Sequence, residues 1–233
     1  MLGRCPAAAG RYARPVTLEP DWLVAARRRP RLRGVLHQYA FFVSLGLGAL
    51  LFAGADGGKE RIAAGIFAVS VSTMLGISAL YHRVVWPPRT RRWMRRLDHA
   101  AIFLLIAGTY TPFGLLALEG AWRVAVLAIV WAGALAAIVL KVAWIDAPRW
   151  VAAVLAVALG WIGASAVPQI YTYAGATPLT LLAAGGVLYT AGAVVYAVKR
   201  PDPAPALFGY HELFHALVVG AAACQFAAVA AIL

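Results

Sequence analysis

Four ionisable side chains lie near the ends of apolar segments of this chain: His82, Asp98, His211 and His215. Ionisable groups inside membrane helices are costly, so several of them at one depth suggest a functional site. Because His211 and His215 are four residues apart, they share one face of a helix. A third imidazole from another segment completes a set with an open position, which is typical of catalytic zinc. We therefore predict a metal site on His82, His211 and His215, with zinc favoured by the imidazole ligands.

Residues 211–215 also match the short H-E-x-x-H pattern of metalloproteases, in which Glu212 would be the general base. Proteases of the common types take a third ligand downstream, but the remaining 18 residues contain no His, Asp or Glu. The third ligand would have to come from upstream, from His82 or Asp98. A membrane metalloprotease is therefore a less favoured alternative.

Each of these residues also has a plain structural interpretation. His82 alone could be an interfacial histidine, and Asp98 could cap the helix that it opens. The Ser78 hydroxyl, one turn before His82, could bond back to its own helix. His37 and His99 have no comparable context, and we expect them to be interfacial or packing residues.

The segments that carry these residues are long and apolar. Of the 233 residues, 63% are hydrophobic and only 13% are charged, which indicates a membrane protein. A helix of about 20 apolar residues crosses a bilayer. Seven runs meet this requirement: residues 36–54, 62–82, 97–118, 122–141, 149–168, 178–198 and 209–231. The predicted fold class is an all-α membrane protein, with a seven-helix transmembrane domain over 35–233 and a basic cytoplasmic tail over 1–34.

The basic residues predict which end of the bundle faces the cytoplasm. With the amino terminus inside, 18 of the 21 Lys and Arg residues lie inside, leaving Lys59, Arg61 and Arg123 outside. The carboxyl terminus is then extracytoplasmic, and all four ionisable residues lie near the inner face. The net charge of +12 is thus assigned to anionic headgroups of the cytoplasmic membrane rather than to nucleic acid.

Local features refine this topology. Residues 20–33 suit a short helix in the inner interface, or else a solvated basic tail. Pro87 and Pro88 end the second run, and Thr109 to Pro112 predict a kink in the third. The cysteines, Cys5 and Cys224, are too far apart along the predicted topology for a disulfide.

Three motifs resemble the bacterial hemolysin III family, the prokaryotic branch of the progestin and adipoQ receptor family that includes the adiponectin receptors. They are Ser-Ala-Leu-Tyr-His at 78–82, the stretch from Leu-Asp-His to Gly-Thr-Tyr-Thr-Pro at 97–112, and His-Glu-Leu-Phe-His at 211–215. The resemblance covers all seven runs. It implies zinc on three histidines near the cytoplasmic side, with Asp98 holding a zinc-bound water and Ser78 near the reacting carbonyl.

The wider family is linked to the hydrolysis of ceramide-like lipid amides and to membrane lipid homeostasis. The resemblance therefore implies a zinc-dependent hydrolase of lipid amide or ester bonds, with Asp98 as general base and then acid and Ser78 as an oxyanion donor. The alternative is a non-enzymatic lipid sensor with structural zinc. A pore-forming hemolysin is less favoured, because no polar stripe crosses the middle of the runs. The long cytoplasmic domain of the eukaryotic receptors is not recognisable, so receptor-style coupling is not carried over.

Overall fold

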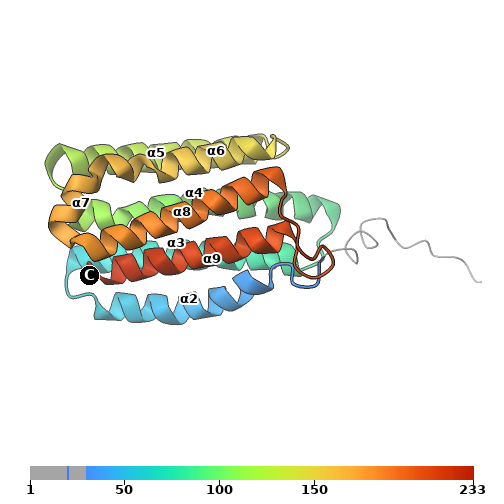
Figure 1. Ribbon diagram of the computed structural model, residues 1–233, viewed down its shortest axis with the longest axis horizontal. Helices are drawn as coiled ribbons and strands as arrows, with labels where there is room; N and C mark the ends of the chain where they lie inside the picture. Colours follow the sequence, from blue (N-terminus) through green and yellow to red (C-terminus); the bar gives the residue numbers. More distant parts are fainter. Residues whose placement is uncertain (1–19, 21–29) are drawn as a thin grey trace, which may run out of the picture.

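The computed structural model describes residue 20 and residues 30–233. In this part the chain forms a bundle of near-parallel and antiparallel helices (Figure 1). The elements are α2 (Val35–Gly54), α3 (Gly58–Arg83), α4 (Pro88–Leu116), α5 (Gly120–Ala143), α6 (Arg149–Gly160), a 3-10 helix η1 (Ile162–Ala166), α7 (Val167–Ala174), α8 (Ala176–Val198) and α9 (Tyr210–Ala230).

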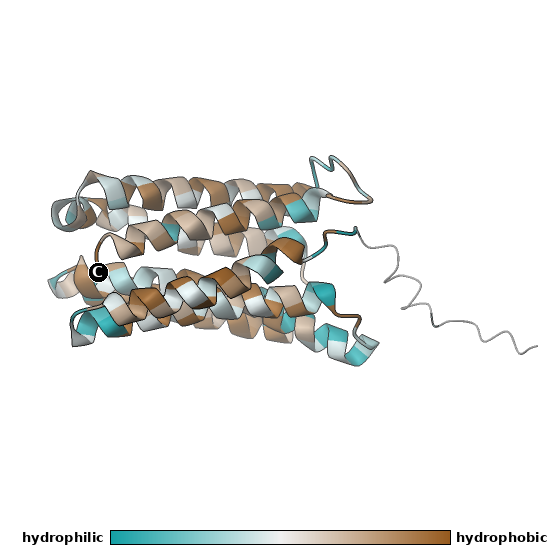
Figure 2. Ribbon diagram, turned by 90° about the horizontal axis from the view of Figure 1, so that it is seen from below, coloured by the Kyte–Doolittle hydropathy of each residue, from teal (hydrophilic) through white to brown (hydrophobic). Residues whose placement is uncertain are grey.

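Seven helical segments of the described chain are long and apolar enough to cross a membrane, α6 to α7 counting as one. Each segment covers most of one of the seven predicted runs. The all-helical, multi-pass prediction is therefore confirmed. Large apolar side chains such as Phe42, Leu50 and Val69 are more than half exposed. This is expected where the surrounding solvent is lipid. Hydrophilic residues gather mostly toward the two ends of the bundle (Figure 2). Which end faces the cytoplasm stays a prediction.

Neighbouring helices pack in chain order and then close on themselves. α2 packs on α3, α3 on α4 and α4 on α5, while α8 packs on α9 and on α6. Contacts of α9 with α2 and α4 bring the last helix back against the first ones. As a result α2, α4 and α9 all begin at the end where α3 finishes (Figure 1). We call it the arginine-rich end, after Arg83, Arg89, Arg91, Arg92, Arg95 and Arg96.

The turn between α3 and α4 follows from two prolines. α3 ends at Arg83, and α4 begins at Pro88, with Pro87 as its N-cap. Proline suits the first helical position, because its fixed φ fits and its missing N–H would have had no helical partner. α4 therefore starts ten residues before Asp98, which lies in the helix interior. The interpretation of Asp98 as a helix cap is wrong.

α4 continues through Pro112 to Leu116. The Thr109 and Thr111 hydroxyls donate to the carbonyls of Leu105 and Ala107, each at 2.9 Å. These bonds run back along the same helix, as threonine hydroxyls commonly do. The predicted kink at Pro112 stays a prediction, since the helix is continuous there.

The fifth predicted run, 149–168, lies within one candidate span, Arg149–Ala174, but this span is not a continuous helix. α6 ends at Gly160, and the chain passes through η1 before α7 begins. Within a membrane, backbone groups freed from a helix need partners inside the protein. The Tyr110 hydroxyl supplies them, because it donates to the Gly160 carbonyl and accepts the Gly163 N–H, both at 2.6 Å.

Most of the predicted tail, including residues 21–29 of the interfacial helix predicted over 20–33, lies outside the described residues. Its end is described, and it is tied to the loop before α9. The N–H groups of Arg31 and Leu32 donate to the carbonyls of Ala206 and Leu207. Gly34 follows, with a left-handed φ of 77°, and a Cβ there would lie 2.6 Å from His82 Cβ. Glycine therefore lets the start of α2 pack directly against α3 beside His82.

Candidate metal centre

His82, His211 and His215 meet at the arginine-rich end of the bundle. Each offers one ring nitrogen, and these three atoms lie within 4.8 Å of one another. The Nε2 atoms of His82 and His211 are 3.2 Å apart. His82 lies at the end of α3, whereas His211 and His215 lie in the first two turns of α9. The three histidines that the sequence singled out thus form one cluster that could hold a metal ion.

The donor set fits zinc. Tetrahedral zinc with nitrogen ligands at ~2.0–2.1 Å separates them by about 3.3 Å, close to the His82–His211 spacing. His215 is 1% exposed, and no hydrogen-bond partner for its Nδ1 is found in the described part of the chain. Buried polar atoms are normally paired, so an orphaned imidazole nitrogen suits a site built for an ion. Three protein ligands would leave a fourth position for water or substrate.

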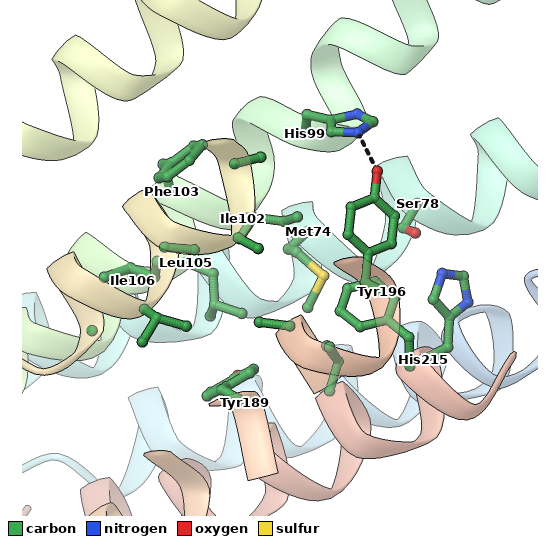
Figure 3. A pocket seen from close by; sticks show the side chains of 18 of the residues that line it. Met74, Ser78, His99, Ile102, Phe103, Leu105, Ile106, Tyr189, Tyr196 and His215 are labelled. Carbon is green, nitrogen blue, oxygen red and sulfur yellow. Dashed lines mark hydrogen bonds between the residues drawn. The ribbon is translucent and has the colours of Figure 1, made fainter. Parts of the chain in front are cut away.

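Asp98 and Ser78 adjoin the cluster. The Asp98 Oδ2 atom is 3.9 Å from His82 Nε2, and a side-chain hydrogen bond links the Asp98 carboxylate to Ser78. Ser78 is buried, one helical turn before His82 on α3. The cluster histidine His215 and Ser78 lie on the same side of the cavity in Figure 3. The structure therefore brings all five residues singled out by the sequence to one place.

The other two histidines also lie here, which the sequence analysis did not foresee. The His37 ring stacks on the His215 ring, with centroids 3.8 Å apart and planes 12° from parallel. His37 is 2% exposed, so it is a packing residue in the metal centre itself rather than an interfacial one. Its position depends on the Gly34 turn and on contacts between α2 and α9, neither of which has a local sequence signal.

His99 links α4 to α8. Its Nδ1 atom is 2.7 Å from the Arg95 carbonyl, which can only accept, so Nδ1 donates. In the neutral ring Nε2 then accepts from the Tyr196 hydroxyl, 3.2 Å away (Figure 3). This agrees with the expected packing role of His99 and places Tyr196, which the sequence analysis did not single out, at the rim of the metal centre.

The Glu212 carboxylate forms an internal ion pair with Arg33. It is 1% exposed, Arg33 Nε donates to its Oε1, and the Gly209 N–H donates to its Oε2 at 2.9 Å. Both carboxylate oxygens are thus used to hold the first turn of α9 and the chain before α2. A general base must reach the proton that it abstracts. The geometry therefore argues against Glu212 as the base of a metalloprotease.

We expect Glu212→Ala to destabilise the protein strongly. Removing one partner of a buried ion pair leaves the other charge uncompensated, at a cost of about 2–3 kcal/mol here because Arg33 still reaches water. Thermal unfolding of the detergent-purified protein measures the change. Arg92→Ala is the matched control, since its pair with Asp146 is exposed and should contribute little. Equal melting temperatures for Glu212→Ala and wild type would contradict this role.

The histidine cluster opens into a cavity of about 970 Å³. Its lining residues on α9 extend from His211 to Gln225, about 20 Å along the helix. Side chains from α3 and α4 line it as well, including Met74, Ile102, Phe103, Leu105 and Ile106 (Figure 3). At the arginine-rich end the lining includes Arg91, Arg92, Arg95 and Arg149. The cavity thus joins a basic mouth, the histidine cluster and a long apolar interior.

Comparison with known proteins gives one consistent result. Residues 25–226 match the protein family described as "Haemolysin-III related". The chain is 33% identical over 161 residues to a protein named "Hemolysin-3 homolog" from Bacillus subtilis (strain 168), which covers 69% of this chain and 72% of that protein. It is 32% identical over 161 residues to "Hemolysin-3" from Bacillus cereus, covering 69% of this chain and 70% of that protein.

Proposed function

This chain belongs to the haemolysin-III related family, and we propose that it is a zinc-dependent membrane hydrolase that cleaves amide or ester bonds of lipids. The observation that carries the proposal is a buried three-histidine cluster facing a long, largely apolar cavity, with a carboxylate beside it. Pockets of about 300–1,000 Å³ with few polar groups are typical of sites for small organic ligands.

His82, His211 and His215 would hold the metal, and zinc is the ion that this donor set favours. When bound, zinc supplies Lewis-acid chemistry, which polarises a carbonyl and makes water nucleophilic near neutral pH. The stacked ring of His37 would hold the His215 ring in place. Supporting contacts of this kind orient metal ligands and commonly influence affinity.

Asp98 is the proposed proton carrier. Its carboxylate would accept a proton from the attacking water and return it to the leaving amine or alcohol. Its position beside His82 supports this role, because the transferred proton must travel only a short distance within the centre. Asp98 lies in the interior of α4, on a rigid element, which favours a fixed geometry.

Ser78 would act through Asp98 and then on the substrate. A serine hydroxyl has one proton, which it can donate to the Asp98 carboxylate in the resting site. Once Asp98 has accepted a proton, it can donate to the Ser78 oxygen. The Ser78 proton is then released to hydrogen-bond the oxyanion that develops on the carbonyl oxygen.

The substrate class follows from the cavity. An acyl chain would occupy the apolar interior with its polar linkage at the histidine cluster, and the basic mouth would lie beside the headgroup. The distribution of Lys and Arg residues along the chain leads us to place the arginine-rich end at the cytoplasmic face of the cell membrane. Basic clusters at that face attract anionic headgroups.

The experiment is a lipid-hydrolysis assay on the purified protein. Wild-type protein should release fatty acid from N-acyl lipids in mixed micelles, measured by mass spectrometry. A zinc chelator should stop the release, and added Zn²⁺ should restore it, because the three histidines must hold zinc for turnover. A protein that contains zinc but releases no fatty acid from amide or ester lipids would argue for the alternative, a lipid sensor with structural zinc.

A further inference from the structure

Two unpaired polar atoms belong to residues that line the cavity away from the histidine cluster. The Tyr189 hydroxyl on α8 and the Gln225 Oε1 atom on α9 are buried, and neither has a hydrogen-bond partner in the described part of the chain. Both residues line the cavity. Gln225 is 6% exposed. Native proteins pair most buried polar groups, so two unpaired oxygens on residues that line one cavity need an explanation.

Away from the histidine cluster, three other polar side chains that line the cavity are paired within the protein. The Thr109 hydroxyl donates to the Leu105 carbonyl, the Tyr110 hydroxyl to Gly160 and the Thr190 hydroxyl to Gly186. Helical threonines satisfy themselves in this way without any ligand. The unpaired state of Tyr189 and Gln225 is therefore not a general property of this apolar interior.

The geometry fixes what these two residues can offer. Gln225 Nε2 donates to the Leu182 carbonyl at 3.3 Å, so the amide is oriented with Oε1 as its free acceptor. A Cβ at Gly185 would lie 2.6 Å from that nitrogen, so glycine makes room for the amide against α8. Tyr189 lies one turn after Gly185 on the same helix. Tyr189 and Gln225 thus line the cavity along the seam between α8 and α9, each with one unpaired oxygen.

This pair lies well away from the metal centre. Gln225 follows His215 by ten residues, about 15 Å along α9, and Tyr189 precedes Tyr196 by seven residues, about 10 Å along α8. Apolar residues such as Val218 line the cavity in between. A ligand that pairs with both Tyr189 and Gln225 would therefore carry a polar group about 10–15 Å from the group at the histidines.

We propose that Tyr189 and Gln225 form a second subsite that recognises a hydroxyl group in the middle of an acyl chain. This rests on the proposed function only in placing an acyl chain in the cavity. The chain hydroxyl donates to Gln225 Oε1 and accepts from the Tyr189 hydroxyl, which pairs both atoms at once. An unhydroxylated chain leaves both unpaired, and sites built for a hydroxyl discriminate against ligands that lack it.

Ricinoleic acid and oleic acid test the subsite, because they differ only in a mid-chain hydroxyl group. Affinities of both acids are measured by calorimetry for wild type, Tyr189→Phe and Gln225→Leu in one detergent. Comparing the ratio of the two affinities between proteins cancels the different partitioning of the acids into micelles. We expect the wild-type ratio to favour ricinoleic acid by about threefold to tenfold relative to either variant, the effect of a single buried hydrogen bond.

Oleic acid is the internal control. Tyr189→Phe removes one oxygen and should bind oleic acid at least as tightly as wild type does, which shows that the variant is folded. A wild-type affinity ratio equal to that of both variants would overturn the subsite while leaving the acyl-chain cavity intact. Binding of neither acid by wild type would instead reject the acyl-chain cavity of the proposed function, and the subsite with it.

Discussion

His211→Ala is expected to remove zinc and turnover together. The variant leaves two of the three clustered imidazoles, His82 and His215, which is fewer protein ligands than catalytic zinc sites usually have. Zinc per chain should fall from about one to near zero. Lipid hydrolysis should fall at least about a thousandfold, since metal catalysis supplies several kcal/mol of transition-state stabilisation.

The matched control for this variant is His99→Ala. It removes an imidazole at the same end of the bundle. This imidazole hydrogen-bonds Arg95 and Tyr196 and lies outside the cluster. Zinc should stay with that protein. Melting temperatures of both variants, measured with chelator present, separate loss of metal from loss of fold. A His211→Ala protein that has lost its zinc but still hydrolyses lipid at the wild-type rate would refute zinc catalysis.

Asp98→Asn should give a different result, in which zinc is kept and turnover is lost. The amide has nearly the same shape as the carboxylate and can still hydrogen-bond Ser78, but it cannot accept a proton. General acid–base catalysis contributes about a hundredfold to ten-thousandfold, and the loss of turnover should lie in that range. Zinc analysis and fatty-acid release are measured on one preparation.

Asp98→Asn needs a control variant at a carboxylate outside the histidine cluster. Asp146→Asn is the control, since Asp146 lies at the same end of the bundle but is exposed and paired with Arg92 and Arg95. Its turnover should match wild type. If Asp98→Asn kept full turnover, Asp98 would not be the proton carrier. Zinc would then have to act with another base.

The spans and the histidine cluster could be predicted from sequence because both depend on local rules. Apolar runs of sufficient length mark the spans, and a four-residue spacing puts His211 and His215 on one face. The basic loops then indicated that His82 and Asp98 lie at the same end as the two α9 histidines. Because the loops are short, consecutive spans must run antiparallel, which decides at which end of the bundle each of these residues lies.

The features that were missed depend on contacts between residues far apart in the chain. Glu212 pairs with Arg33, 179 positions away, and no spacing rule connects them. The break after Gly160 is stabilised by Tyr110 on α4, 50 residues earlier. A hydropathy pattern records that residues 149–168 are apolar, but it does not record that their helix ends midway. The alternative of Asp98 as a cap fails because α4 begins ten residues earlier, in a charged stretch that an apolar run does not include.

The most direct test of the account is X-ray absorption at the zinc edge, with metal quantification, on the purified wild-type protein. We predict about one zinc per chain with three nitrogen ligands at ~2.0–2.1 Å, and loss of this signal in His211→Ala. A wild-type protein that binds no zinc when the metal is supplied, or whose zinc coordination is the same in His211→Ala, would contradict the three-histidine site.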